Sequence, residues 1–214
     1  MILGYCFDLD GTLLDTETLW VKAIEEFLHA AGHAISSDAA QALVYGHSWH
    51  DIHQEISSTY TDLQMPVTDM EQKIAPYYEA LSSACDVRIP SSIELLKELA
   101  DEAPICIVSG SSRATIERAI ETMGIAPLLQ FYLGAEDYSP GKPDPACYAL
   151  AAHRLGLAPE SCMVFEDSQV GVQSAKAAGM LCIGLAREHA PKQDLSGADA
   201  QVSDLGGFDP IEWM

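Results

Sequence analysis

Acidic, hydroxyl and basic side chains follow four short apolar runs of the sequence, at points where buried strands would end. They are Asp8 and Asp10 after the first run, Ser109 and Gly110 after the second, Lys142 beyond the third, and Glu166 and Asp167 at the end of the fourth. Parallel sheets bring the carboxyl ends of their strands to one edge, where ligands bind. If the runs are neighbouring strands, these residues form one site.

The acidic residues of this set suit phosphoryl transfer beside a bound cation. A cluster of carboxylates is costly without a counter-charge, and oxygen ligands at this density suit Mg²⁺. A carboxylate such as Asp8 also attacks phosphorus and forms an acyl-phosphate. Asp10 lies two residues further along an extended chain, so it points to the same side. It is therefore placed to protonate a leaving oxygen and later to activate water.

The remaining residues of the set are suited to hold a phosphate group. Ser109 offers a hydroxyl to phosphate oxygens, and backbone N–H groups nearby, such as that of Gly110, add further donors. Lys142 offers a fixed positive charge to the transition state. Together with the acidic residues, they would complete a site for phosphoryl transfer.

An alternation of apolar runs and helical patterns predicts the elements that position these residues. The runs that we interpret as strands are residues 2–7, 105–108, 131–133, 163–165 and 181–185. Helical patterns separate the later runs, and Ser91 with Glu94 predicts a capping box at the start of one helix. The alternation predicts an α/β fold whose core is a Rossmann-like, doubly wound parallel sheet.

Residues 15–86 interrupt this alternation. They contain two helical stripes of apolar residues, one through Trp20 and Ile24 and the other through Met70 and Ile74, and no convincing strand. We therefore expect a helical cap domain of residues 15–86, inserted into a Rossmann-like catalytic core of residues 1–14 and 87–214.

Four strings of the sequence resemble the motifs of the haloacid dehalogenase superfamily, in the order that the family has. They are FDLDGTLLDTE, VSGSS, GKPDP and VFEDSQVG. The helical insertion after the first string resembles the subfamily with a helical C1 cap, so the resemblance covers nearly the whole chain. It implies a Mg²⁺-dependent phosphomonoester hydrolase, with a small phosphorylated metabolite as its substrate.

The resemblance also implies a role for each matching residue. Asp8 matches the nucleophile and a metal ligand, and Asp10 matches the general acid/base, with its backbone carbonyl on the metal. Ser109 and Lys142 match the phosphate holders. The other metal contacts that the resemblance implies are Asp167 directly and Glu166 through water.

Departures from the family patterns rank the alternatives. Asp10 argues for phosphate chemistry, because family dehalogenases of 2-haloacids do not keep this residue. A β-phosphoglucomutase-like mutase is the first alternative, but its cap His and Arg are matched here by Trp20 and Trp49. A phosphonoacetaldehyde hydrolase is less favoured, because Lys22 is the only lysine near the place of its Schiff base. A non-catalytic phospho-acceptor or binding protein, such as a signalling receiver, is a further alternative. Receivers, however, lack a helical insertion and lack a second Asp two residues after the first, where this chain has Asp10.

His47 and Trp49 are the candidate substrate contacts of the cap. They lie in residues 46–50, a segment that we expect to meet the substrate. His47, His50 and His53 have a spacing of three, which would place them roughly on one helical face, so a zinc site is a less favoured alternative.

The charge of the cap predicts the kind of substrate. Its only Lys and Arg residues are Lys22 and Lys73. A desolvated anion without a partner is costly, so the cap is poorly suited to a second phosphate. We expect one phosphate on a neutral, hydroxyl-rich body, such as a sugar or polyol monophosphate.

Composition narrows the partners and the compartment. The net charge of -21 would repel nucleic acid and anionic membranes. The six cysteines form no C-x-x-C pair, and Asp8 and Asp10 interrupt the stretch that a signal peptide would need. We expect a cytoplasmic protein with reduced cysteines, a monomer or weak dimer, that binds neither nucleic acid nor membrane.

Overall fold

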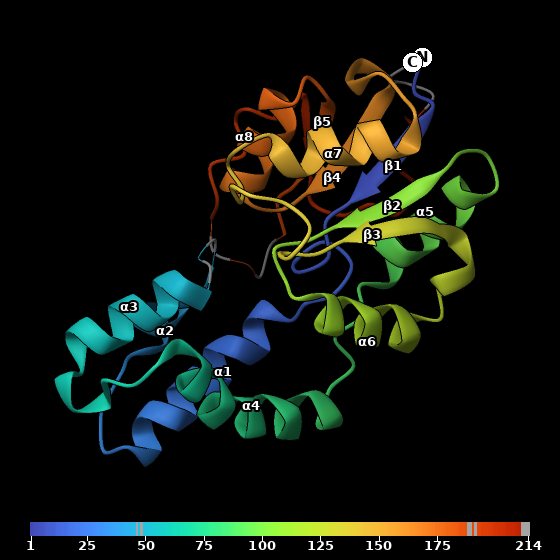
Figure 1. Cartoon of the computed structure of the whole chain (residues 1–214). Coiled ribbons are helices and arrows are strands. Elements are labelled where there is room, and N and C mark those ends of the chain that lie inside the picture. Colours follow the sequence, from blue (N-terminus) through green and yellow to red (C-terminus); the bar gives the residue numbers. More distant parts are fainter. Residues whose placement is uncertain (46, 48, 188–189, 191, 211–214) are drawn as a thin grey trace. The chain divides into compact units, whose positions relative to one another are not determined.

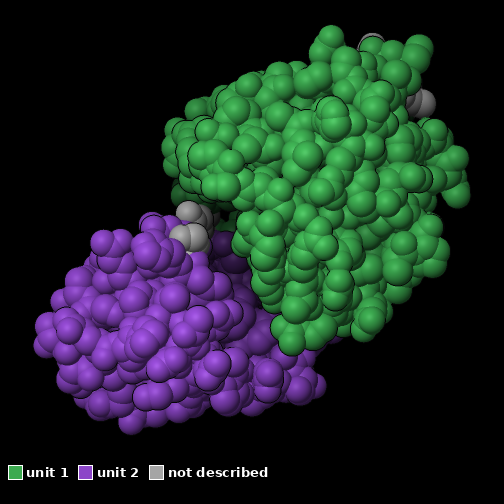
Figure 2. All heavy atoms as spheres, viewed as in Figure 1, with its two compact units in different colours: residues 1–14, 88–214 green, residues 15–87 purple. Residues whose placement is uncertain are grey.

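The computed structural model describes residues 1–45, 47, 49–187, 190 and 192–210 of the chain. The chain forms two compact units (Figure 2): Met1–Leu14 together with Arg88–Met214, and Asp15–Val87. The role of the second unit as a cap stays a prediction. Among the described residues, no helix is both long and apolar enough to cross a membrane.

The first unit is built on a six-stranded parallel sheet with the order β3-β2-β1-β4-β5-β6. Its strands are β1 (Gly4–Phe7), β2 (Ile105–Val108), β3 (Leu129–Leu133), β4 (Cys162–Glu166), β5 (Leu181–Leu185) and β6 (Ala200–Val202). All residues of β1, β2 and β4 are buried, as expected for strands covered on both faces. The structure confirms the predicted Rossmann-like α/β fold.

Four helices cover the two faces of this sheet. They are α5 (Pro90–Ala100), α6 (Arg113–Met123), α7 (Ala146–Leu155) and α8 (Gln169–Ala177). The chain passes from β1 through β2 to β3 at one edge of the sheet. It then crosses over to β4, on the other side of β1. Because crossovers are right-handed, α5 and α6 lie on one face and α7 and α8 on the other (Figure 1).

The predicted capping box at the start of α5 is wrong. The N-cap residue is Ile89, which has no side chain able to accept, and Pro90 takes the first helical position. Proline is favoured there because its missing N–H costs nothing. The Ser91 hydroxyl instead donates to Asp204 Oδ2 at 2.7 Å.

The second unit is a small assembly of helices. They are α1 (Glu17–Ala30), α2 (Ser37–Val44), α3 (Trp49–Thr59) and α4 (Val67–Ala84), with a 3-10 turn at Thr61–Leu63. The predicted stripes form its core: Ile24 and Leu28 of α1 are fully buried, as are Met70 and Ile74 of α4. No strand is assigned within the described part of this unit.

The six cysteines are all unpaired, as expected. Five of them are fully buried between the sheet and helices α7 and α8: Cys6, Cys106, Cys147, Cys162 and Cys182. Cys6 and Cys106 face each other across β1 and β2, with their sulfur atoms 3.5 Å apart. Cys85, at the C-cap of α4, is exposed.

Candidate active site

The candidate site lies where β2, β1 and β4 end side by side. Asp8 follows β1, and its backbone N–H donates to the Phe165 carbonyl of β4 at 3.0 Å. Ser109 follows β2, and its N–H donates to the Leu133 carbonyl of β3 at 3.0 Å. These bonds continue the ladders past the strand ends and fix both residues. Because the strand order reverses beside β1, the site occupies the switch point at which open sheets bind ligands.

Three of the predicted acidic side chains meet at this edge. Oxygen atoms of Asp8, Glu166 and Asp167 all lie within 4.8 Å of one another. The three residues are 6%, 0% and 7% exposed, respectively. Negative charges that lie this close together and are buried away from water require compensation by a cation.

The turn after β1 places glycine against this cluster. Gly11 has a φ of 85°, a conformation that residues with a side chain rarely adopt. A Cβ atom at Gly11 would lie 1.9 Å from Asp167 Oδ2. The backbone at Gly11 thus lies so close to the end of β4 that only glycine fits at this position.

The side chain of Asp10 has different partners from that of Asp8. Its Oδ2 atom accepts hydrogen bonds from the hydroxyls of Ser111 at 2.7 Å and Ser109 at 3.2 Å. Ser109 Oγ in turn accepts the backbone N–H of Ser111 at 3.0 Å. The two aspartates are therefore held separately, Asp10 by the loop after β2. Gly110, in the same loop, is exposed.

Lys142 is the basic residue of the site. Its ammonium donates to Asp8 Oδ1 at 2.6 Å, to Glu166 Oε1 at 2.5 Å and to the Val108 carbonyl at 3.2 Å. The prediction that β3 and the following loop would bring Lys142 to the acidic cluster thus agrees with the geometry. One ammonium lies against more than one carboxylate, so the site keeps an excess of negative charge.

Burial and this excess of negative charge together shift the pKa values of Asp8 and Lys142. Burial raises the pKa of Asp8 well above its usual range; Lys142 opposes this, and Glu166, Asp167 and Asp10 add to it. Burial alone would lower the pKa of Lys142, but Asp8 and Glu166 raise it well above normal. The lysine therefore stays charged, while an ionised Asp8 needs more positive charge than Lys142 supplies.

The residues present fit a divalent cation. The cluster offers hard carboxylate oxygens from Asp8 and Asp167 at the spacing of a single ion, and it lacks the charge that such an ion would bring. A bound Mg²⁺ would supply that charge and favour the ionised form of Asp8.

The two predicted substrate contacts of the insertion lie in the second unit. Trp49 is the first residue of α3 and packs edge-on against Trp20, with ring centroids 4.9 Å apart. Trp20 also stacks on Tyr78 at 3.9 Å. His47 is exposed, and its backbone N–H donates to the Val44 carbonyl. Their contact with substrate stays a prediction, and Gly46 and Ser48 of the same segment lie outside the described residues.

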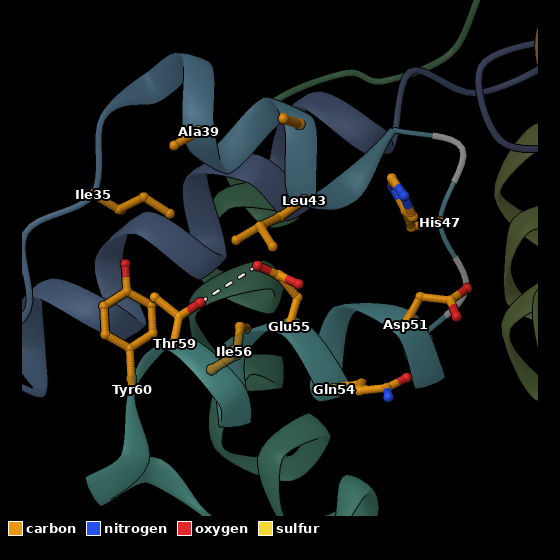
Figure 3. Close-up of a pocket in the computed structure, with 11 residues that line it drawn as sticks. Ile35, Ala39, Leu43, His47, Asp51, Gln54, Glu55, Ile56, Thr59 and Tyr60 are labelled. Carbon is orange, nitrogen blue, oxygen red and sulfur yellow. Dashed lines mark hydrogen bonds between the residues drawn. The ribbon is translucent and has the colours of Figure 1, made fainter.

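A groove of about 530 Å³ lies between α2 and α3 within this unit (Figure 3). His47 and Asp51 lie at one end, and Ile35 and Tyr60 at the other. The groove shares no residue with the carboxylate cluster. The groove of the second unit therefore does not coincide with the candidate active site.

The predicted helical face of three histidines is wrong. Helix α3 begins at Trp49, so His47 precedes it and only His50 and His53 are on the helix. His53 Nε2 donates to the Met65 carbonyl at 2.7 Å. This bond holds the end of the α3–α4 connection and gives His53 a structural partner.

A family comparison agrees with this geometry. The sequence model of haloacid dehalogenase-like hydrolases matches residues 5–185, which include every residue of the site. The chain belongs to this family. It is 29% identical over 200 residues to validoxylamine A 7'-phosphate phosphatase of Streptomyces hygroscopicus subsp. limoneus, covering 93% of this chain and 92% of that protein. It is 30% identical over 177 residues to fructose-1-phosphate phosphatase YqaB of Escherichia coli (strain K12), covering 83% and 93%.

Solved structures show the same fold for this haloacid dehalogenase-like hydrolase. CbbY from Rhodobacter sphaeroides in complex with phosphate superimposes with a TM-score of 0.82, over 97% of this chain and 96% of that one. The two sequences are 22% identical, so this likeness concerns the fold.

Several residues of the site were missed from the sequence. Ser111 and Ser168 stand inside the quoted motif strings, so their hydroxyls were there to be considered. Gly171 also stands inside a quoted string, at the end of VFEDSQVG, whereas Tyr148 carries no such signal. Tyr148 follows the GKPDP string on an apolar face of α7, where an aromatic residue predicts core packing only.

Proposed function

We propose that this chain is a Mg²⁺-dependent phosphatase that hydrolyses small phosphorylated metabolites through an aspartyl-phosphate on Asp8. The observation that carries the proposal is the contact of Lys142 with Asp8 inside a buried carboxylate cluster at the switch point of the sheet. A nucleophilic carboxylate beside a fixed ammonium is what an incoming phosphate group needs. Relatives named as phosphatases support the same activity.

Each residue has a part in the proposed reaction. Asp8 attacks phosphorus, and the bond from phosphorus to the ester oxygen breaks as Asp10 donates a proton to that oxygen. Asp10 then takes a proton from water, the water oxygen attacks the aspartyl-phosphate, and Asp8 is released with inorganic phosphate. Lys142 and Ser109 hold the phosphate oxygens, with the backbone of Gly110 beside them. Asp8, Asp167 and the backbone of Asp10 would hold Mg²⁺, with Glu166 beside them.

The proposed substrate carries one phosphate on a neutral, hydroxyl-rich body, such as a sugar or polyol. Lys22 and Lys73 are the only Lys and Arg residues of the second unit, and both are exposed. The names of the two relatives, which act on fructose 1-phosphate and on validoxylamine A 7'-phosphate, support a sugar-like body.

Phosphate release from p-nitrophenyl phosphate tests the activity. We expect many turnovers per protein molecule with Mg²⁺, none in EDTA, and recovery when Mg²⁺ is added back. Ca²⁺ should restore less, because its larger and looser coordination suits the site poorly. Full activity in EDTA would contradict the metal requirement, and a single turnover would indicate a phospho-acceptor.

A matched panel of metabolites tests the substrate class. At fixed ionic strength, we expect kcat/KM to be highest for sugar and polyol monophosphates. Fructose 1,6-bisphosphate and nucleoside triphosphates should be poor substrates, because the second unit has little positive charge for a further phosphate. A bisphosphate that outperforms every monophosphate would overturn the charge argument and leave the phosphatase activity standing.

A further inference from the structure

Tyr148 is a fully buried tyrosine of α7 that has no part in the proposed reaction. Its hydroxyl donates to Glu166 Oε1 at 2.8 Å, and its ring centroid lies 5.1 Å from the Lys142 ammonium. A buried hydroxyl requires a partner. Here the partner is the same carboxylate oxygen that accepts from Lys142, so Tyr148 and Lys142 are joined through one atom.

The hydrogen-bonding capacity of Glu166 is fully used. Oε1 accepts from Lys142 and Tyr148, and Oε2 accepts from the backbone N–H of Ser168 at 3.2 Å and its hydroxyl at 2.9 Å. A carboxylate has about four lone-pair positions, two on each oxygen. A metal ion bound directly to Glu166 would have to displace one of these four donors.

Helix α8 closes the remaining side of the Glu166 carboxylate. A Cβ atom at Gly171 would lie 1.9 Å from both the Glu166 carboxyl carbon and Oε1. Glu166 itself is 0% exposed. The carboxylate is therefore confined between α7, α8 and the lysine, and it cannot turn without moving backbone.

The same geometry fixes the lysine. An ammonium has three N–H donors, and those of Lys142 are used by Glu166, the Val108 carbonyl and Asp8. The first two acceptors hold the ammonium in place. The third bond places it beside the oxygen that we expect to attack phosphorus.

We propose that Tyr148 is a positioning residue that acts through Glu166 to fix the Lys142 ammonium beside Asp8, and that Glu166 anchors the lysine instead of binding the metal ion. This inference rests on the proposed function, because it assigns Lys142 to the incoming phosphate. It adds the Tyr148 hydroxyl to the site and separates the roles of the two acidic residues at the end of β4. Glu166 would hold Lys142, and Asp167 would hold the metal ion.

The variant Tyr148→Phe removes only the hydroxyl and keeps the ring. We expect inorganic phosphate to bind about tenfold more weakly, the usual cost of losing a hydrogen bond to a charged group, and kcat/KM to fall with it. The Mg²⁺ dissociation constant, measured by calorimetry without substrate, should shift by less than the roughly 10–100-fold that follows loss of a partner of a metal ligand. A shift in Mg²⁺ affinity of that size, with phosphate affinity unchanged, would overturn the assignment of Glu166.

A double-mutant cycle separates positioning from general stability. In the Lys142→Ala background, Tyr148→Phe should have no further effect on phosphate affinity or kcat/KM, because its target is gone. An equal effect in both backgrounds would show that Tyr148 acts independently of the lysine and would contradict the proposal. Tyr5→Phe is the matched control: Tyr5 is also buried, on β1, and we expect activity close to wild type.

Two further measurements keep the outcomes distinct. Circular dichroism and a thermal melt check that Tyr148→Phe folds; if it does not, Ser168→Ala tests the other oxygen of Glu166 with the same expected pattern. Wild-type protein without turnover but with the coupling in phosphate affinity would overturn the proposed function alone. Turnover without coupling would overturn this inference alone.

Discussion

The two units hold their polar candidate residues in opposite ways. In the first unit, Asp8 and Glu166 are buried at strand ends, where both accept from Lys142 of the loop after β3. Lys142 and Glu166 each have several fixed partners. In the second unit, His47 is exposed and Trp49 packs against another aromatic ring. Buried polar groups must be hydrogen-bonded, so several contacts together fix the position of each side chain. Fixed geometry of this kind supports the proposed reaction at the strand ends of the first unit, whereas the candidate residues of the second unit are held by fewer polar contacts.

Asp8→Asn should have the largest effect. We expect kcat to fall by at least about 10³-fold, because the amide is no nucleophile. The melting temperature measured in EDTA should stay level or rise, because the substitution removes a charge that burial already disfavours. An Asp8→Asn variant that keeps a tenth of the wild-type kcat would contradict the role of Asp8 as the nucleophile.

Gly11→Ala should come next, and it sharpens the comparison directly. We expect a loss of about 1–2 kcal/mol in unfolding free energy from the positive φ, together with a large loss of Mg²⁺-dependent activity, because the new Cβ would meet Asp167. Gly32→Ala in the second unit is the control: its φ is 89°, but nothing lies within 4 Å of the new atom. Urea unfolding should show the cost of the positive φ in both variants and a further loss in Gly11→Ala from the overlap with Asp167. The value of kcat/KM should fall only in Gly11→Ala.

The sequence predicts the main strands of the sheet better than its short edge strand and the starts of its helices. The apolar runs of β1, β2, β4 and β5 are continuous, because both faces of those strands are covered, and this pattern is readable. Strand β6 gives no such pattern, because it has three residues and none is fully buried. The start of α5 was misjudged because a serine hydroxyl has several possible partners, and the pairing of Ser91 with Asp204 depends on residues 113 positions apart.

The same limit applies to the site. The motif residues Asp8, Ser109, Lys142 and Asp167 could be found because their types and order point to one chemistry. Tyr148 could not, because its hydroxyl acquires a task only when α7 packs on the sheet beside Glu166. Patterns along the chain report burial and local structure, whereas a bond between two elements depends on the tertiary fold.

Trp20→Ala should have the smallest effect on the chemistry and tests the other half of the comparison. The half-buried Trp20 stacks on Tyr78 and meets Trp49, so its loss should cost about 2 kcal/mol of unfolding free energy. Lys22→Ala, an exposed position of the same helix, should cost little. Turnover of p-nitrophenyl phosphate by folded Trp20→Ala should stay within a few fold of wild type; a loss like that of Asp8→Asn would erase the difference between the units.

The distribution of thiols gives the protein a built-in chemical reporter. Five cysteines are sealed in the core of the sheet unit, and Cys85 alone is exposed, near the end of the helical insertion. A maleimide dye should therefore attach at a single position of the native chain without mutagenesis. The other five sulfurs become reactive only when the sheet unit opens, so pulsed alkylation followed by mass spectrometry would record the opening of that unit separately from labelling at Cys85.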